Sequence, residues 1–244
     1  MKKEWNVFEN EFFKDDISLV VCESLETKTT IMTYLLYEYA MNEKREVLLY
    51  SFDKKCEYYY RHLLSCISKI DKKLLTKYLY PWLGLSHDNT DMINRFYFVS
   101  SIEKIQQSNL FMIENNIGIE GDYFDSILEM VECDSSEFII LEDFNILLQK
   151  SKYSRKEILR KLKEYSEKYE VHFILFCYSK REENLSDISN VIIGKQTGIL
   201  AHKKMIKTLE MLTYKNRKLE KKIKLEYNKN NYVINGRDVN ELYG

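Results

Sequence analysis

The sequence predicts a single α/β domain with a mainly parallel central sheet, helices on both faces, and antiparallel strands added at its C-terminal end. Short runs that are apolar throughout alternate with segments of helical periodicity, which is typical of parallel strands covered on both faces. The stretch 205–234 instead shows successive strand-like runs separated by turn-like residues. No repeat or flexible linker divides the chain, so we expect a lead segment, 1–14, and one domain, 15–244.

Composition narrows the classes of function. With 244 residues and 45% hydrophobic content, the chain can bury one large core. A net charge of −1 means that any contact with nucleic acid must come from a local patch. No run reaches the roughly 18 apolar residues of a membrane span, and the basic start lacks the apolar region of a signal peptide. We therefore expect no membrane partner.

The cysteines favour a reducing environment. The chain has five of them, scattered and never in C-x-x-C spacing. Such a pattern supports neither a disulfide framework nor a zinc site. The expected location is the cytoplasm.

The first half of the domain is expected to alternate strands with helices. The predicted strands are 17–22 and 46–52, and the predicted helices are 28–42 and 56–70. The segment 71–94 contains the only proline and a turn-like "SHDNTD", so we expect it to be irregular or to form short helices.

The second half continues this alternation and ends in strands. Residues 95–101 are predicted to form a third strand, and 102–117 and 122–133 to form helices divided by "GIEGD". The remaining expectations are a strand over 137–144 that ends in acids, a helix over 154–169, strands over 171–179 and 190–195, and the terminal strands within 205–234.

One short stretch, "CESLETKTT" at 22–30, has the place and spacing of a phosphate-binding loop, G-x-x-x-x-G-K-[ST]. Lys28 and Thr29 supply the K-T pair, but Cys22 and Thr27 occupy the two glycine positions. Glycine permits the positive φ that lets backbone amides approach a phosphate, and β-branched Thr27 would be strained there.

Two glutamates in the same stretch add an electrostatic obstacle. Glu23 and Glu26 would place carboxylates in or beside a cradle meant for a polyanion. At about 4 Å, each like-charge contact costs on the order of 1 kcal/mol in water and more at lower dielectric. The loop is therefore predicted to bind phosphate poorly.

The order of these elements resembles that of RecA-like ATPases, and four stretches resemble the ATPase domain of hexameric replicative DNA helicases of the DnaB type. They are "VLLYSFDKKCEYYYRHLLSCISKID", "FIILEDFNILL", "ILFCYSKR" and "LTYKNRKLEKKIKLEYNKNNYVI". The resemblance covers about 15–234. It implies a RecA-like fold, ATP with Mg²⁺ as cofactor, single-stranded DNA as partner, and assembly with copies of itself or with a replicative helicase.

The resemblance assigns roles to residues of the loop. Lys28 corresponds to the lysine that neutralises the β- and γ-phosphates, and Thr29 to the hydroxyl ligand of Mg²⁺. Thr27 and Thr30 flank them as further cofactor-binding candidates. Alternatively, Lys28 is a surface lysine at a helix start.

Acidic residues follow two of the predicted strands. Asp53 stands where the family has the carboxylate that polarises water, one methylene shorter, or it caps the next helix. The acid that supports Mg²⁺ is Glu142 or Asp143: Glu142 keeps the family's register, and Asp143 keeps its residue type. Tyr178 replaces the family's polar sensor.

Basic residues near the C-terminal end complete the implied site. Lys215 and Arg217 correspond to the family's residues that reach a neighbouring subunit's ATP, or they form a basic turn. The stretch 194–207 corresponds to a DNA-contacting loop, or it is a solvated loop. Its candidate contacts are Lys195, Lys203, Lys204 and Lys207.

These observations support three hypotheses of function. The first is a divergent helicase-like protein with a degenerate ATP site and weak or absent ATPase activity, acting in DNA replication or on a mobile element. The second is a non-enzymatic pseudo-ATPase that serves as an interaction or DNA-binding scaffold and regulates a helicase. The third is an ATPase of the wider RecA-like group with another client.

Overall fold

The computed structural model describes most of the predicted domain. The described residues are 17–79, 89–114, 122–133, 135–178, 188, 190–199, 206–216, 218–228, 230 and 234–236. The predicted lead segment, 1–14, lies outside them.

A nine-stranded sheet runs through the molecule in the order β3-β2-β4-β5-β1-β6-β7-β8-β9. The parallel part comprises β1 (Ile17–Cys22), β2 (Val47–Ser51), β3 (Leu110–Glu114), β4 (Phe138–Leu141), β5 (His172–Tyr178) and β6 (Asn190–Ile199). The strands β7 (Ile206–Lys215), β8 (Lys218–Asn228) and β9 (Ile234–Gly236) continue it antiparallel. The predicted mainly parallel sheet with C-terminal antiparallel strands is confirmed.

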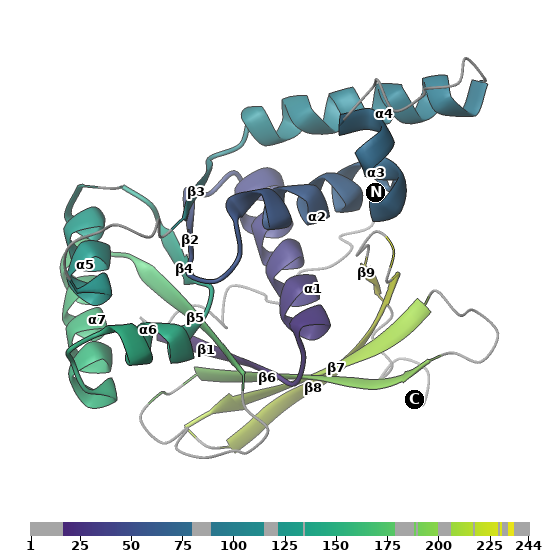
Figure 1. The fold of residues 1–244 in the computed structure, drawn as a ribbon. Helices are drawn as coiled ribbons and strands as arrows, with labels where there is room; N and C mark the ends of the chain where they lie inside the picture. The colour runs from purple at the N-terminus through teal and green to yellow at the C-terminus, as the bar shows by residue number, and fades with distance from the viewer. Residues whose placement is uncertain are drawn as a thin grey trace.

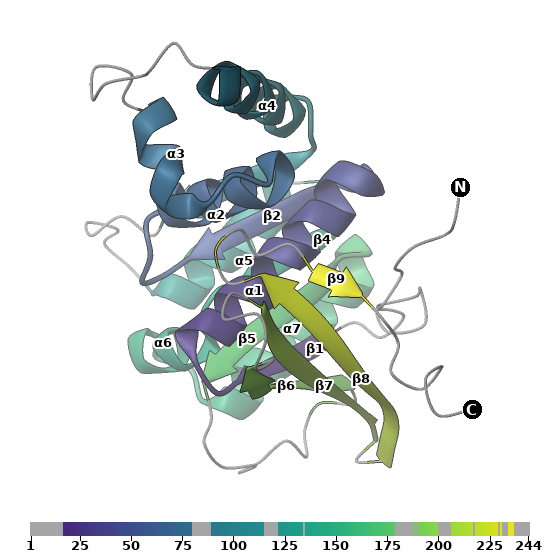
Figure 2. The same ribbon diagram turned by 90° about the vertical axis from the view of Figure 1, so that its right-hand side faces the viewer.

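Helices cover both faces of the parallel strands (Figure 1, Figure 2). One face carries α1 (Leu25–Leu36), its π-helical continuation η1 (Tyr37–Asn42), α2 (Cys56–Ser68), α3 (Lys72–Leu79) and α4 (Asn89–Gln106). The other carries α5 (Tyr123–Cys133), α6 (Phe144–Lys150) and α7 (Arg155–Tyr169).

The central strands are apolar throughout because a layer of helices covers each face of the sheet. Along β1, Val20 belongs to the core beneath α1 and α2, whereas its neighbours Leu19 and Val21 belong to the core beneath α5–α7. Successive side chains of a strand point to opposite faces, so a strand buried on both faces must be apolar throughout. The continuous apolar runs of the sequence were thus a valid signal for the central strands.

Two predictions in the middle of the chain are wrong. Residues 95–101 form no strand but lie within α4, whose buried side chains Phe98 and Ile105 join the core on the α2 face. The predicted helix 102–117 ends at Gln106, and the third strand is β3. Tertiary packing overrode the local preference of "RFYFVSS" for strand, and pairing with β2 selected "LFMIE" as the strand.

Strand extends further into the stretch 194–207 than predicted, because β6 reaches beyond the expected end at 195. Strand β6 continues to Ile199 and β7 begins at Ile206, with Lys195 opposite Glu210 in their ladder. Cross-strand hydrogen bonding therefore satisfies backbone that the small and polar residues had indicated to be loop. The short helix α6 was not predicted.

The helices give no sign of membrane insertion. Within the described ranges, no helix combines the length and apolar character needed to cross a bilayer.

Gly194 on β6 permits the close approach of α1 to the sheet. A Cβ atom at this position would lie 2.6 Å from Ile31 Cδ1 and 3.0 Å from Thr27 Cγ2. We expect Gly194→Ala to lower the free energy of unfolding by about 1–3 kcal/mol, because the buried side chains of Ile31 and Thr27 must move to make room. Urea unfolding measures this change.

The matched control for this substitution is Glu129→Ala, at an exposed position on α5. It should stay within about 0.5 kcal/mol of the wild type. Equal stability of the Gly194 variant and the control would contradict the close packing of α1 on β6.

Candidate functional site

Helix α1 begins almost directly after strand β1. Only Glu23 and Ser24 separate Cys22 from Leu25. Ser24 caps the helix, since its hydroxyl oxygen accepts from the Thr27 amide at 3.1 Å. The segment that would wrap a phosphate is therefore already helical.

This early helix start removes the expected strain. The described non-glycine residues with positive φ are Lys44, Lys69, Glu170 and Asn216, so Thr27 is not among them. The prediction that Thr27 is strained is wrong, because the chain forms a capped helix where a glycine-rich loop would turn.

The threonine hydroxyls of this stretch are engaged by the helix itself. Thr29 donates to the Leu25 carbonyl at 2.8 Å, and Thr30 donates to the Glu26 carbonyl at 2.8 Å. Thr27 shares a hydrogen bond of 3.0 Å with the Ser24 hydroxyl. The predicted roles of Thr27, Thr29 and Thr30 in binding ATP and Mg²⁺ stay predictions.

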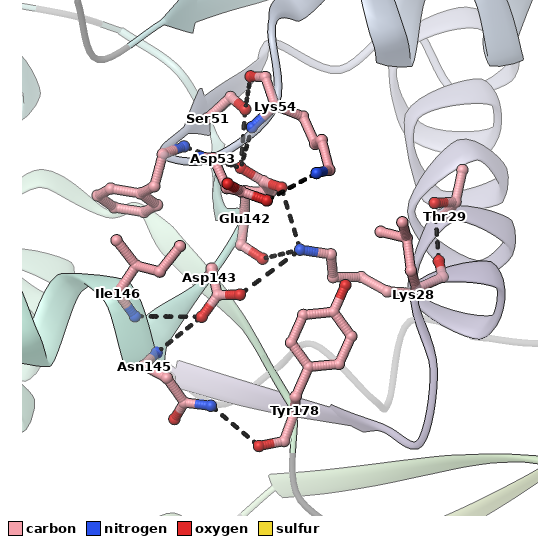
Figure 3. A network of polar contacts seen from close by, with 12 residues as sticks. Lys28, Thr29, Ser51, Asp53, Lys54, Glu142, Asp143, Asn145, Ile146 and Tyr178 are labelled. Atoms are coloured by element: carbon pink, nitrogen blue, oxygen red, sulfur yellow. Dashed lines mark hydrogen bonds and ion pairs between the residues drawn. The ribbon is translucent and has the colours of Figure 1, made fainter. Parts of the chain in front are cut away.

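Lys28 points into the molecule rather than into solvent (Figure 3). Its side chain is 1% exposed, and Nζ lies 3.0 Å from Glu142 Oε1 and 3.7 Å from Asp143 Oδ2. It also donates to the Glu142 carbonyl at 3.3 Å and lies 4.7 Å from the centre of the Tyr178 ring. The alternative of a surface lysine is therefore wrong.

The carboxylate of Glu142 collects hydrogen bonds from three other parts of the chain. Oε2 accepts from the Ser51 hydroxyl at 2.8 Å and from the amides of Phe52 and Asp53 at 2.8 and 3.0 Å. Oε1 accepts from the Tyr59 hydroxyl at 2.5 Å as well as from Lys28.

These donors explain how a fully buried carboxylate stays ionised. Burial alone raises the pKa of Glu142, but the Lys28 ammonium, the Tyr59 hydroxyl, the Asp53 amide and the Ser51 hydroxyl together lower it to about 2. The same carboxylate raises the pKa of Tyr59, in addition to the effect of burial. Tyr59 therefore stays a neutral donor.

Asp143 serves chiefly as the N-cap of α6. Its Oδ1 accepts from the amides of Asn145 and Ile146 at 3.0 and 3.2 Å. Burial raises the pKa of Asp143, and the neighbouring Glu142 charge adds to this effect. Of the two candidate metal-supporting acids, Glu142 has both oxygens enclosed, while the nearest described partner of Asp143 Oδ2 is Lys28.

Asp53 lies at the border of this cluster. Its carboxylate is 52% exposed and pairs with Lys54 at 2.8 Å, while its amide bonds Glu142. The predicted role in polarising water stays a prediction.

Lys215 lies at the opposite end of the sheet from Lys28. It pairs with Asn190, which pairs in turn with Ser18 at the start of β1, whereas Lys28 follows the end of β1. Lys215 is thus remote from the Lys28 cluster of its own chain. Arg217 lies outside the described residues.

Lys207, one of the predicted DNA contacts, forms an ion pair within the chain. Lys207 Nζ lies 2.6 Å from Glu26 Oε2, and the Tyr227 hydroxyl donates to Glu26 Oε1 at 3.0 Å. Glu26 therefore ties β7 and β8 to α1. Lys195 lies on β6, and Lys203 and Lys204 lie outside the described residues.

Sequence reasoning missed the two hydroxyl donors of this cluster. Ser51 ends an apolar strand, and Tyr59 lies one turn into the next helix. A polar residue closing a buried strand was the available signal for Ser51. Nothing distinguished Tyr59 from Tyr58 and Tyr60, because only the helix orientation selects which tyrosine faces Glu142.

The residues, as placed, do not fit Mg²⁺-ATP. The backbone over 25–29, which would cradle phosphate, is helical, and the Lys28 ammonium contacts two carboxylates. Moreover, among the described residues no group of three or more His, Cys, Asp or Glu side chains is arranged to hold a metal ion. The chemistry that the cluster supports in this arrangement is internal charge neutralisation.

Comparison with known proteins shows similarity of structure without similarity of sequence. No protein-family model matches the chain, and no curated protein matches it. A solved structure of an ATPase domain superposes with a TM-score of 0.70 at 15% identity, and the match covers 91% of this chain and 84% of that one.

Two further structures show the same fold. A DnaB-like replicative helicase, described with its interactions with primase, gives a TM-score of 0.70 at 14% identity; the match covers 91% of this chain but only 59% of the helicase. A KaiC-like protein of Pyrococcus horikoshii gives 0.56 at 14% identity and covers 91% and 89% of the two chains. The chain therefore has a RecA-like α/β fold, as its sequence had indicated.

Removing one partner of the buried pair should destabilise the fold. We expect Glu142→Ala to lower the free energy of unfolding by about 3–5 kcal/mol, because the buried charge of Lys28 would lose its closer carboxylate partner and keep only the longer contact with Asp143. Adding Lys28→Met should recover part of this loss. A double-mutant cycle by urea unfolding measures the coupling. Additive effects of the two substitutions would contradict the pairing.

The depressed pKa of Glu142 should also appear in the pH dependence of stability. Its folded pKa of about 2 lies below the ordinary value of 4.5, so its contribution is present above pH 4.5 and is lost as pH falls toward 2. The stability difference between the wild type and Glu142→Gln should shrink over this range. Urea unfolding at several pH values checks this expectation, and a constant difference would contradict it.

Proposed function

We propose that this chain is a helicase-related RecA-like protein whose ATP site is degenerate, with weak or absent ATPase activity. The observation that carries the proposal is the position of Lys28, which is buried against Glu142 and Asp143. A lysine that binds phosphate must present its ammonium to the ligand. Here the chain's own carboxylates take the place of the ligand's negative charge.

The energetic consequence of this arrangement is large. Withdrawing Lys28 would leave Glu142 with one fewer cationic partner in a buried site, and breaking such a pair costs about 3–5 kcal/mol. Each 1.4 kcal/mol corresponds to a tenfold change in affinity. An ordinary micromolar nucleotide site would therefore weaken by at least about 10²-fold.

The rest of the cluster supports a scaffold role rather than rapid turnover. The Glu142 network joins β4, α1, α2 and the turn after β2 through contacts within the chain. Because this network engages Lys28, it supports a pseudo-ATPase that acts by binding. We propose that its work lies in DNA replication or the maintenance of a mobile element, in association with copies of itself or with a replicative helicase.

Calorimetric titration with Mg²⁺-ATP tests the degenerate site. We expect the dissociation constant of the wild type to exceed about 100 μM, since the Lys28–Glu142 pair must open first. The wild-type titration decides the question by itself. Micromolar binding would contradict the proposal.

Two variants test whether any Mg²⁺-ATP binding occurs at the Lys28 site. Lys28→Ala removes the buried ammonium, and Lys54→Ala removes the partly exposed ammonium that pairs with Asp53. Micromolar binding that Lys28→Ala abolishes and Lys54→Ala preserves would show a working phosphate site. Circular dichroism of both variants verifies that they are folded.

A further inference from the structure

Strand β3 forms one edge of the central sheet. It pairs with β2, and within the described ranges no other strand lies beside it. The Val47 amide of β2 donates to the Asn109 carbonyl at 2.9 Å, and the backbone groups of successive strand residues point to opposite sides. The amides and carbonyls of residues 110, 112 and 114 therefore point away from the sheet.

This edge lacks the features that usually keep an open strand from pairing. Strand β3 reads "LFMIE", without lysine or proline, and its ladder with β2 runs without a bulge. Natural sheets protect an open edge with such features, or they cover it with another segment. The unprotected sequence of β3 indicates that its edge is covered.

Both faces of the sheet are apolar beside this edge. Leu110 and Met112 pack partly buried against the core on the α2 face, and Ile113 does so on the α5 face. Phe111 points to the same face as Ile113 and is 55% exposed. A strand added beyond β3 would extend both faces, so it should be rich in aromatic and β-branched residues.

The segment that precedes β1 has the composition and the reach for this position. Residues 5–13, "WNVFENEFF", contain five large apolar side chains, all of them aromatic or β-branched. A strand outside β3 lies five strand spacings from β1, or about 24 Å, which an extended chain crosses in about 7 residues. Of the 16 residues before Ile17, about 9 then remain for pairing, which is more than the five of β3.

The direction of approach also fits. The strands from β3 to β1 are all parallel and begin at the same end of the sheet. A segment that leads into Ile17 therefore passes the starts of β5, β4 and β2, and it runs antiparallel along β3. The segment that follows β9 instead leaves from the opposite edge of the sheet, eight strand spacings from β3.

We propose that the open edge of β3 is a docking site for this chain's own lead segment, which adds an antiparallel strand to the sheet. Strand addition obtains its affinity from main-chain hydrogen bonds and its selectivity from side-chain contacts. The tether gives the lead an effective concentration of about a millimolar, which favours it over the lead of a second copy. This inference does not depend on the state of the ATP site.

Hydrogen exchange of single amides, measured by NMR on the full chain, tests the proposal. The three outward amides of β3 should be protected in the wild type. Replacing both Val7 and Phe8 by proline removes main-chain donors at adjacent positions of the lead, and the outward amides should then exchange at least about tenfold faster. Equal rates in the wild type and this variant would overturn the proposal.

The matched control also carries two prolines, in place of Lys2 and Lys3. These positions lie outside the apolar run, so the outward amides should keep their wild-type rates. Circular dichroism verifies that both variants are folded. An equal loss of protection in the control would mean that pairing by the apolar run is not its source, which would also contradict the proposal.

Exchange at two concentrations distinguishes the chain's own lead from that of a second copy. Mass spectrometry of a peptide that contains β3 should show the same protection at about 1 and 100 μM, because pairing within one chain does not depend on concentration. Protection that is present only at 100 μM would show that a second copy supplies the strand, and the proposal would be wrong.

A substitution in β3 tests the contact from the other side. The Met112 amide points away from β2, so Met112→Pro preserves the ladder with β2 but removes a donor to the added strand. In a Trp82→Phe background, Trp5 is the remaining tryptophan. Its fluorescence should shift to longer wavelength with Met112→Pro and stay unchanged with the control, Met112→Ala. The same emission in all three chains would contradict docking on β3.

Discussion

The buried carboxylate of Glu142 requires an ion pair and hydrogen bonds to stay ionised. The arrangement of the domain around β4 depends on the segments that supply these partners. An ionised group without water is tolerated only when paired and hydrogen-bonded. Here the partners come from α1, from α2 and from the turn that follows β2. Because each partner belongs to a different segment, satisfying one charge fixes the relative positions of four parts of the chain.

This constraint links the fold to its proposed use. In a phosphate-binding site, a lysine and free backbone amides meet a ligand's negative charge. Here Lys28 and the amides of Phe52 and Asp53 meet a carboxylate of the same chain. The negative charge that these groups meet is therefore supplied by the chain itself.

The local sequence pattern predicted the elements correctly where local preference and tertiary packing favour the same structure. Continuous apolar runs identified β1, β2, β4 and β5, since burial on both faces demands them. It failed over 95–101, where aromatic residues favour strand locally but Phe98 packs with Ile105 on one buried face of α4, and over 110–114, which form β3 rather than the predicted helix. For the site, the sequence singled out Lys28, Glu142 and Asp143, yet it could not find Tyr59, whose role depends on the rotation of α2 toward β4.

The sequence by itself determined the layered α/β fold and the polar residues at the ends of its strands, because periodicity and burial are written in residue order. Only the tertiary structure decided what those residues do. Whether Lys28 faces a ligand or a carboxylate depends on where α1 begins and how close it lies to β4. Those distances arise from contacts between segments that are remote in sequence.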